Sequence, residues 1–407
     1  MNIKFLLSTT LIATTLSASA QDANKTFAIT GDGNRDFMWM NIRQVDIGSG
    51  KIVQDVYQRD KTAFLLADAD SKNALADHRR PTETMVAAAA YDKNQNKLFF
   101  TPMRIGELRW LDLNAKGTEQ KYFSVTSSLL NTNEALADEA NHFTRMVIAA
   151  DGNGYALNND GSRLIKFTTG KKVTITDLGP VVDDESNKTV SVKNKCTSWG
   201  GDMIADAYNK LYIISANHYV FVLDAETRVA KQIGYITGLP ANYSTNGAAV
   251  DKDGNVVVAS ANTFAGYYKF SLKDFVATAI EGSDLVYNAS DLANGTLLYQ
   301  KEADAARTFA DFKPVVPVLT NEAHIYPNPV TNNEFKIYFD GQQAGRYNVA
   351  ITDLSGKPVM NRIVNVGSAK SQIETVPLSR AFAKGMYMVK VTDASNKFIF
   401  TERIVVQ

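Results

Sequence analysis

The sequence predicts an all-β protein in which a β-propeller is followed by a small C-terminal β-sandwich. Two observations predict this. A short phrase recurs along the first three quarters of the chain, and strict alternation of apolar and polar residues marks the last eighty or so residues. In each copy of the phrase an apolar strand ends in Asp, a polar turn with Asn or Gly follows, and two further short apolar strands come next. Copies begin at Met85, Met146, Met203 and Ala248, with a weaker copy around Asp291.

Each copy of the phrase has the composition of one propeller blade. Asp, Asn and Gly accept the backbone geometry of hairpin turns, and short runs of Val, Ile, Phe and Tyr suit strands that are covered on both faces. Repeats of roughly forty to sixty residues with about four strands each are typical of β-propellers. We therefore predict a propeller over residues 21–302. A β-sandwich of evenly spaced short strands remains the alternative.

The two ends of this region predict how the ring closes. Residues 27–57 have the pattern of the later strands of a blade, without its first strand. Residues 284–301 have the pattern of the first strands of a blade, without its last strand. Closure of the ring removes exposed sheet edges. Six blades follow if each end builds most of its own blade, and five if the ends share one. Six blades are favoured, and in architecture the region resembles the broad family of secreted six-bladed propellers.

The first twenty residues have the pattern of a secretory signal peptide. Lys4 precedes an apolar stretch over residues 5–16, and Ala18 and Ala20 occupy the two positions that a signal peptidase reads. We predict a signal peptide over residues 1–20, cleavage before Gln21, and export by the Sec translocon into the periplasm. No later run of about eighteen apolar residues exists, so we expect no transmembrane segment.

Charge and cysteine content argue against a nucleic-acid partner and against disulfide cross-links. Lys and Arg number 43 and Asp and Glu number 43, without a basic run, so we expect no nucleic-acid partner. Cys196 is the one cysteine, which excludes an internal disulfide, and we expect it to be a small buried apolar residue.

A break in the pattern separates the two predicted domains. Residues 303–322 begin with Ala and charged residues and continue into Lys313-Pro314-Val315-Val316-Pro317, which predicts an extended linker. The domain after it, residues 323–407, holds about seven alternating segments, as expected for a small β-sandwich. Its recurring features are the opening Tyr326, Pro327, Asn328 and Pro329, and two Gly-x-Tyr strands that begin at Gly345 with Tyr347 and at Gly385 with Tyr387.

These motifs resemble those of the type A C-terminal sorting domain of the type IX secretion system. The resemblance implies that the type IX machinery is a partner and that the protein is secreted or attached to the outer cell surface. Glu402-Arg403 departs from the family, in which we expect a Lys in the last strand. Whether the domain is cut off after export is not decided by the sequence.

Candidate ligand-binding residues precede the first strand of each predicted blade, where they would surround the mouth of the channel. They are Glu83, His142, Arg145, Trp199, Asp202, Asn246 and Asn288. Such groups either hold a ligand or cap strands and bind channel water. Glu83, Asp202, Asn246 and Asn288 carry the oxygen ligands that calcium takes, so calcium is the one cofactor considered. The identity of any metal ligands stays open, and no catalytic residue is assigned.

Three functional hypotheses follow. The favoured one is an exported binding protein with a glycan or protein ligand. The alternatives are a metal-dependent hydrolase or lactonase with its site in the channel, and a structural surface protein. Whether the chain is an enzyme is left open, with a binding protein preferred. A closed channel beneath an exposed aromatic face would favour binding. Aromatic side chains that form either a stacking platform or blade core are Trp39, Trp110, Trp199, Tyr208, Tyr243, Tyr267 and Tyr268.

Overall fold

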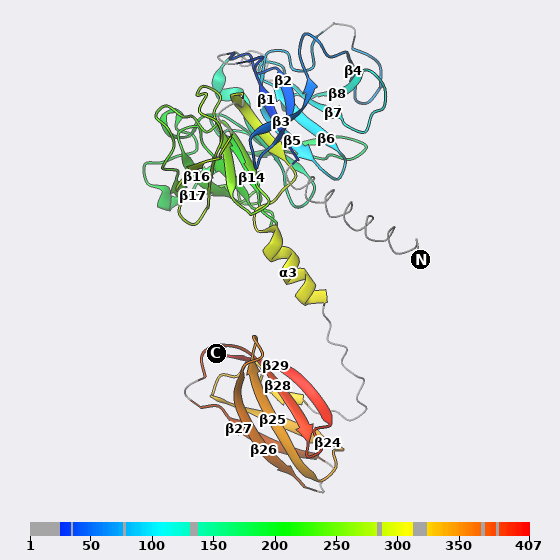
Figure 1. The fold of residues 1–407 in the computed structure, drawn as a ribbon, viewed down its shortest axis with the longest axis vertical. Coiled ribbons are helices and arrows are strands. Elements are labelled where there is room, and N and C mark those ends of the chain that lie inside the picture. The colour runs from blue at the N-terminus through cyan, green and yellow to red at the C-terminus, as the bar shows by residue number, and fades with distance from the viewer. Residues whose placement is uncertain are drawn as a thin grey trace, which may run out of the picture. The chain divides into compact units, whose positions relative to one another are not determined.

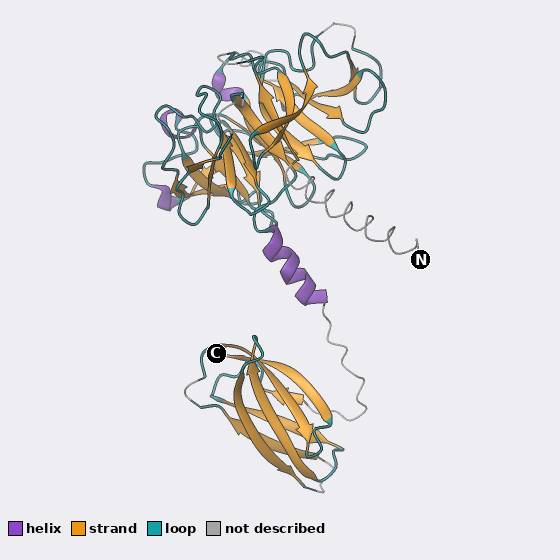
Figure 2. Ribbon diagram, viewed as in Figure 1, coloured by secondary structure: helices purple, strands orange, loops and turns teal. Residues whose placement is uncertain are grey.

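The computed structural model describes residues 25–33, 36–75, 79–130, 137–282, 287–311, 324–367, 371–379 and 382–407. The chain divides into two compact units, Met1–Thr308 and Phe309–Gln407, coloured along the chain in Figure 1. Figure 2 shows that strands dominate both units. The predicted signal peptide lies outside the described residues. In the part of the chain that is described, no helix is both long and apolar enough to cross a bilayer.

Five sheets make up the described part of the first unit. Blade 1 consists of β22 (Ala289–Asn294), β1 (Lys25–Thr30), β2 (Asn41–Asp46) and β3 (Lys51–Tyr57). Blade 2 consists of β5 (Val86–Asp92), β6 (Lys97–Pro102), β7 (Glu107–Asp112), β8 (Gln120–Thr126) and β4 (Phe64–Asp68). Blade 3 consists of β9 (Phe143–Ile148), β10 (Gly154–Asn158), β11 (Leu164–Phe167) and β12 (Ile175–Gly179). Blade 4 consists of β14 (Asp202–Ala205), β15 (Leu211–Ile214), β16 (Tyr219–Leu223), β17 (Val229–Tyr235) and β13 (Val182–Asp183). Blade 5 consists of β18 (Gly247–Val250), β19 (Val256–Ala259), β20 (Tyr268–Phe270) and β21 (Thr278–Ala279).

These sheets form a closed β-propeller. The first strand named in each blade is its inner strand, and the inner strands β22, β5, β9, β14 and β18 contact one another in this cyclic order. All five run in the same direction, so each blade begins at one face of the ring, here called the entrance face. Short helices interrupt the loops at η3 (Glu139–Asn141), η4 (Glu185–Asn187) and α2 (Lys195–Ser198).

The ring has five blades in the described residues, so the favoured prediction of six is wrong. The two ends of the propeller sequence share one blade, because β1 pairs with β22, from Thr26 opposite Asn294 to Thr30 opposite Ala289. Figure 1 shows the corresponding blue and yellow strands side by side. Sharing one blade ties the two ends of the ring together with backbone hydrogen bonds and leaves neither end as a free edge.

The recurring Asp of the sequence phrase folds the turn after each inner strand of blades 2 to 5. In blade 5, Asp251 Oδ1 accepts hydrogen bonds from the backbone N–H groups of Asp253 and Asn255, both at 2.8 Å. In blade 3, Asp151 Oδ1 accepts one from Asn153 at 3.0 Å. These are Asx turns, in which the carboxylate substitutes for a backbone acceptor.

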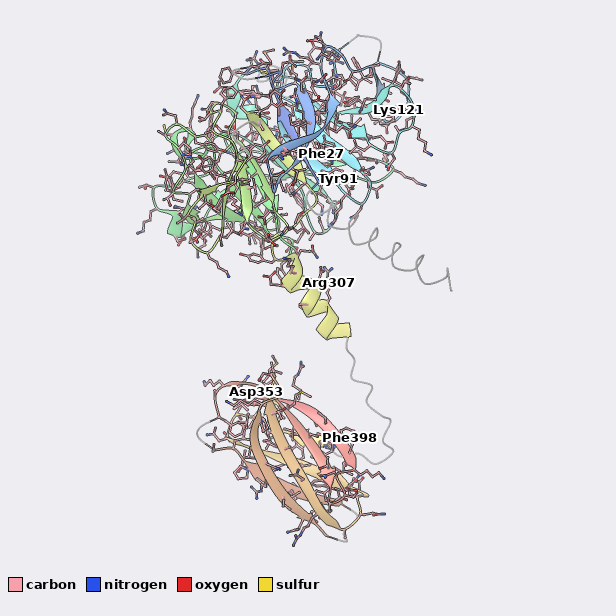
Figure 3. The ribbon with its side chains drawn as sticks, viewed as in Figure 1. Phe27, Tyr91, Lys121, Arg307, Asp353 and Phe398 are labelled. Atoms are coloured by element: carbon pink, nitrogen blue, oxygen red, sulfur yellow. The ribbon has the colours of Figure 1, made fainter. Side chains whose placement is uncertain are left out.

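Apolar side chains fill the space between neighbouring blades. Phe27 of blade 1 and Tyr91 of blade 2 point toward one another, with ring centroids 4.9 Å apart (Figure 3). In blade 3 the ring of Phe167 lies directly on the backbone of Gly154, where an added Cβ would stand 2.0 Å from the ring. Close packing of this kind, between blades and within them, is the main source of stability for a propeller without disulfides.

Helix α3 (Gln300–Asp311) follows the ring and corrects the prediction of an extended linker over residues 303–322. Residues 300–311 are helical because they include Lys301, Glu302, Arg307 and several Ala residues, which are good helix formers, and because no proline lies between Gln300 and Pro314. Pro314 and Pro317 lie outside the described residues.

The second unit consists of two sheets around one core. One sheet contains β23 (His324–Tyr326), β24 (Glu334–Asp340) and β27 (Ser371–Pro377). The other contains β26 (Pro358–Val366), β25 (Gly345–Asp353), β28 (Gly385–Asp393) and β29 (Phe398–Val406). Inward residues of both sheets, such as Phe335, Ile337, Val349 and Val389, are fully buried in a shared cluster. This arrangement is the predicted β-sandwich.

Candidate functional site

The axis of the propeller is occupied by two buried carboxyl groups, Asp202 of β14 and Asp291 of β22, both 0% exposed. Asp202 Oδ1 accepts a hydrogen bond from the backbone N–H of Met203 at 2.6 Å, and Oδ2 accepts one from Ala248 of β18 at 2.7 Å. Blades 5 and 1 approach closely here because Gly247 has no side chain. A Cβ on it would stand 2.8 Å from the backbone of Asp291.

Burial raises the pKa of Asp202 and of Asp291 well above the usual value, and the adjacent Asp202 charge raises that of Asp291 further. The N–H groups that point at Asp202 oppose this effect by stabilising its charged form. Both carboxyl oxygens of Asp291 lack a hydrogen-bond partner among the described residues. Burial therefore favours the neutral form of each carboxyl, and the two carboxyls titrate as a coupled pair.

Arg145 of β9 closes the channel beside this pair. Its side chain is 0% exposed, and its guanidinium donates to backbone carbonyl oxygens of Asn158, Ser198 and Gly200. Burial lowers the pKa of Arg145 to about 10, although the negative charges of Asp202 and Asp160 act in the opposite direction. Arg145 thus joins blade 3 to the loop that enters blade 4.

The other predicted channel-mouth residues are distributed between two places. Asn246 and Asn288 are both hydrogen-bonded to the backbone of Ala261. Asn246 Oδ1 accepts a hydrogen bond from the Ala261 N–H at 3.0 Å, and Asn288 Nδ2 donates one to the Ala261 carbonyl. Glu83 is separate from them, with Oε2 bonded to the N–H of Arg80 at 3.2 Å.

His142 and Trp199 lie on the side of Arg145. His142 is buried, and its carbonyl accepts from the N–H of Asn159. Trp199 is partly exposed and donates from Nε1 to the Lys193 carbonyl at 3.1 Å. Asn246 also lies near the loop that enters blade 4, since a Cβ on Gly200 would stand 3.8 Å from its Nδ2. A ligand role for these seven residues stays a prediction.

Two of the four candidate calcium ligands have their oxygen atoms in hydrogen bonds, whereas the buried Asn288 Oδ1 has no hydrogen-bond partner among the described residues. Both oxygens of Asp202 and the Oδ1 of Asn246 already accept backbone hydrogen bonds. Within the described ranges, no group of three or more His, Cys, Asp or Glu side chains has metal-binding geometry.

An aromatic platform lies on the entrance face, formed by Phe37, Met38 and Trp39 of blade 1 and Phe264 of blade 5. Phe37 and Met38 are 46% and 44% exposed. The rings of Phe37 and Phe264 are 5.9 Å apart and those of Phe37 and Trp39 6.5 Å apart, so the platform spans the junction of the two blades. Phe37, Met38 and Phe264 were not among the predicted site residues, because they lie in loops without periodicity.

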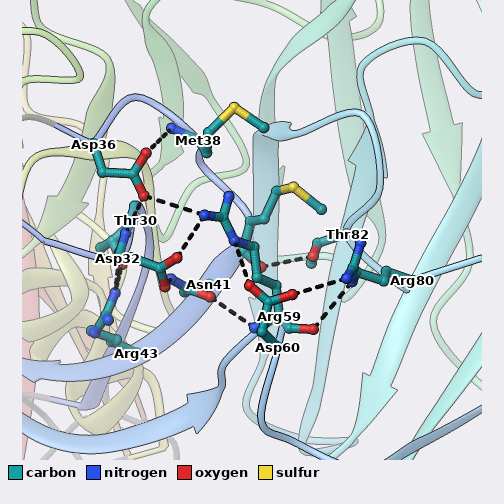
Figure 4. Close-up of polar contacts among 12 residues, drawn as sticks. Thr30, Asp32, Asp36, Met38, Asn41, Arg43, Arg59, Asp60, Arg80 and Thr82 are labelled. Atoms are coloured by element: carbon teal, nitrogen blue, oxygen red, sulfur yellow. Dashed lines mark hydrogen bonds and ion pairs between the residues drawn. The ribbon is translucent and has the colours of Figure 1, made fainter.

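Charged residues hold the platform loop in place (Figure 4). Asp36 accepts hydrogen bonds from the backbone N–H groups of Met38 at 3.0 Å and Asp32 at 2.6 Å. Arg59 pairs with Asp32 at 2.7 Å and with Asp60 at 3.3 Å, and Arg80 of blade 2 pairs with Asp60 at 2.8 Å.

The aromatic residues singled out from the sequence divide between core and surface. Trp110, Tyr243 and Tyr267 are buried and belong to the blade core. Trp39, Trp199 and Tyr268 are partly exposed, and Tyr208 is 57% exposed. Cys196, expected to be buried, is exposed because it lies in the short surface helix α2.

The motif residues of the second unit tie its first segment to its last strand. Asn328 Nδ2 donates to the Arg403 carbonyl at 2.7 Å, and Asn328 Oδ1 accepts from the Val405 N–H at 3.0 Å. The two Gly-x-Tyr strands have the same tyrosine hydrogen bond. The hydroxyls of Tyr347 and Tyr387 each donate to the backbone carbonyl four residues earlier, at 2.7 and 2.8 Å. Glu402, the departure from the family pattern, accepts the N–H of Ile325 at 2.9 Å.

Residues 324–407 match the family model described as the secretion system C-terminal sorting domain. The protein carries a type IX sorting domain. It is therefore cargo of the type IX secretion system, exported and either secreted or attached to the cell surface. No curated protein matches the chain in sequence.

Solved structures resemble the chain only distantly. PorZ, a surface component of the type IX secretion system of Porphyromonas gingivalis, is 16% identical with a TM-score of 0.32, over 94% of this chain and 51% of PorZ. The chain thus spans about half the length of PorZ. Virginiamycin B lyase of Staphylococcus aureus is 11% identical with a TM-score of 0.33, over 90% of this chain and 92% of the lyase. A putative 6-phosphogluconolactonase of Bacteroides fragilis is 10% identical with a TM-score of 0.38, over 67% of this chain and 98% of that chain. The propeller assignment rests on the ring of five sheets.

Proposed function

We propose that this exported protein is a binding protein whose propeller holds a protein partner on the aromatic platform of the entrance face. One observation carries the proposal: Phe37 and Met38 are large apolar side chains that remain almost half exposed on a loop held by ion pairs and hydrogen bonds. Exposed apolar side chains that gather in one place mark interaction sites on soluble proteins.

The platform is organised before any partner arrives. Asp36 and Arg59 hold the loop from one side, and the carbonyl of Trp39 accepts the N–H of Val86 in blade 2 at 3.0 Å. A loop fixed in this way loses little conformational entropy when a partner binds, which favours affinity.

The chemistry of the platform matches that of protein interfaces. Phe, Met, Trp and Arg are enriched in interface cores, and here Arg59 and Arg80 lie beside the apolar side chains. A fitting partner presents an apolar side chain toward Phe37 and Phe264, and polar groups toward the surrounding charges.

The channel offers less support for the hydrolase hypothesis. Asp202, Asp291 and Arg145 are all 0% exposed, so a substrate has no access to the carboxyl pair. A closed channel beneath an exposed aromatic face is the combination that favours binding over catalysis.

A capture experiment followed by a binding measurement tests the proposal. The mature chain and a Phe37→Ala/Met38→Ala variant are used to capture proteins from the outer surface of the producing bacterium, and the captured partner is then purified and titrated. Because truncation of central apolar contacts costs on the order of 2 kcal/mol or more, we expect the Kd to rise by at least about tenfold.

The matched control is Ile52→Ala/Val53→Ala, which removes an exposed apolar pair from β3 of the same blade, 38% and 52% exposed. This control should bind as the unmodified chain does. Equal affinity of the platform variant, or equal loss in the control, would refute the platform as the binding surface.

A further inference from the structure

We propose that the cleft between blades 3 and 4 binds a saccharide that carries a carboxylate. This site is separate from the platform and goes beyond the proposed function. The cleft has a volume of about 420 Å³ and lies among the turns that follow the inner strands of the two blades. That volume falls within the range of roughly 300–1,000 Å³ found for small-molecule sites.

The cations of the cleft are not equivalent. Lys166 pairs with Asp151 at 3.0 Å, and Lys210 pairs with Asp224. Arg228 lines the same cleft, but the bond observed for it runs from Nη1 to the backbone carbonyl of Leu178 at 2.6 Å.

No carboxylate of the described residues pairs with Arg228, and its Nε, which is buried, has no hydrogen-bond partner there. Among the described residues, Arg228 is therefore the one cation of this lining without an ion-pair partner, and Glu226 is the one carboxylate without such a partner. A guanidinium binds a carboxylate through two parallel hydrogen bonds, a geometry that an ammonium cannot supply. The anion is thus assigned to Arg228 rather than to the two lysines, whose charges are already compensated.

The remaining lining suits the ring and hydroxyls of a sugar. Tyr208 is 57% exposed at the cleft and offers an aromatic face on which a pyranose ring stacks. Asn209, which also holds the N–H of Asp151 at 3.2 Å, and the carboxylates of Asp151 and Asp224 supply donors and acceptors for hydroxyl groups. An uncompensated guanidinium, an exposed tyrosine ring and polar side chains together define an acidic saccharide as the ligand class.

The test titrates the mature chain with trigalacturonate, with neutral maltotriose and with inorganic phosphate, and measures heat by calorimetry. We expect saturable binding of trigalacturonate and none of maltotriose. Arg228→Gln, which keeps the side-chain length and removes the charge, should weaken trigalacturonate binding about tenfold to a hundredfold, as expected for a lost charge-assisted hydrogen bond. Tyr208→Ala should also weaken it.

The matched control is Arg163→Gln. Arg163 lies in blade 3, one of the two blades that border the cleft. It likewise donates to one backbone carbonyl, that of Leu129 at 2.7 Å, but it does not line the cleft. This variant should bind trigalacturonate normally, and unfolding midpoints recorded for every variant show that the fold is retained. Equal binding of maltotriose, or an Arg228→Gln variant that binds trigalacturonate unchanged, would overturn the proposal. Binding of phosphate as tightly as trigalacturonate would overturn the saccharide assignment. These outcomes leave the platform untouched, since its test uses other residues and another ligand.

Discussion

Replacement of Asp291 by Asn should stabilise the propeller at neutral pH, although Asp291 lies in the centre of the ring. In the unmodified chain this carboxyl is buried next to the Asp202 carboxyl, and its oxygens lack a hydrogen-bond partner among the described residues. Asn has nearly the same shape and is neutral at every pH. Its amide group donates a hydrogen bond to the Asp202 carboxylate without having to take up a proton first.

The size of the effect follows from proton linkage. Because the pKa of Asp291 is raised above its usual value of 3.8, the folded chain binds one more proton than the unfolded chain at pH values between the two. The contribution of Asp291 to stability is thus greatest in acid and falls as the pH rises through this window, by about 1.4 kcal/mol per pH unit. This loss accumulates from the usual pKa up to the raised pKa of the folded chain, and it is the gain available to Asp291→Asn.

The assay is denaturant unfolding followed by tryptophan fluorescence between pH 4 and pH 8. Trp39, Trp110 and Trp199 are the three tryptophans of the chain and all lie in the propeller, so their emission reports on this unit alone in the intact protein. The difference in unfolding free energy between Asp291→Asn and the unmodified chain should be near zero at pH 4 and grow with pH.

Asp202→Asn is the control, since it places an amide N–H where the N–H groups of Met203 and Ala248 need an acceptor. It should destabilise the propeller by about 1–3 kcal/mol, the usual cost of a buried donor without a partner. The reasoning is refuted if Asp291→Asn is less stable than the unmodified chain at pH 7, or if the two substitutions have the same effect.

Two further predictions concern the blade core and the sorting motif. Gly154→Ala should destabilise the propeller by about 1–3 kcal/mol, because the added Cβ would stand 2.0 Å from the ring of Phe167. The control Gly170→Ala places its Cβ in open space and should leave the unfolding free energy unchanged in the same assay. Asn328→Ala removes both hydrogen bonds between the opening motif and the last strand, and should reduce the amount of protein that reaches the cell surface and medium, measured by fractionation and immunoblotting. The exposed Asn361 provides the matched alanine control, and equal export of both variants would contradict a role for the motif bonds.

Local patterns in the sequence were enough to predict the strands and turns and the secretion pathway. Each recurring Asp bonds to backbone N–H groups two to four residues later, as Asp251 and Asp92 do, so the turn is specified by a few neighbouring residues. The alternation around Tyr347 and Tyr387 likewise specifies the strands of the sorting domain, and the motif around Asn328 is continuous in sequence. Contacts of this kind need no knowledge of the rest of the chain.

Contacts between distant segments were decided only by the tertiary structure. The number of blades depends on whether Thr26–Thr30 pairs with the strand that begins at Ala289, and the sequence of either strand fits both a shared blade and two separate ones. The platform exists because closure of the ring brings Phe37 beside Phe264. The pKa of Asp291 is raised because closure buries it beside Asp202. The sequence by itself determined the strands, turns and export signal, since these rest on local hydrogen bonding and side-chain alternation. The tertiary structure decided the ring and its binding surfaces, since these rest on burial and charge between residues far apart in the chain.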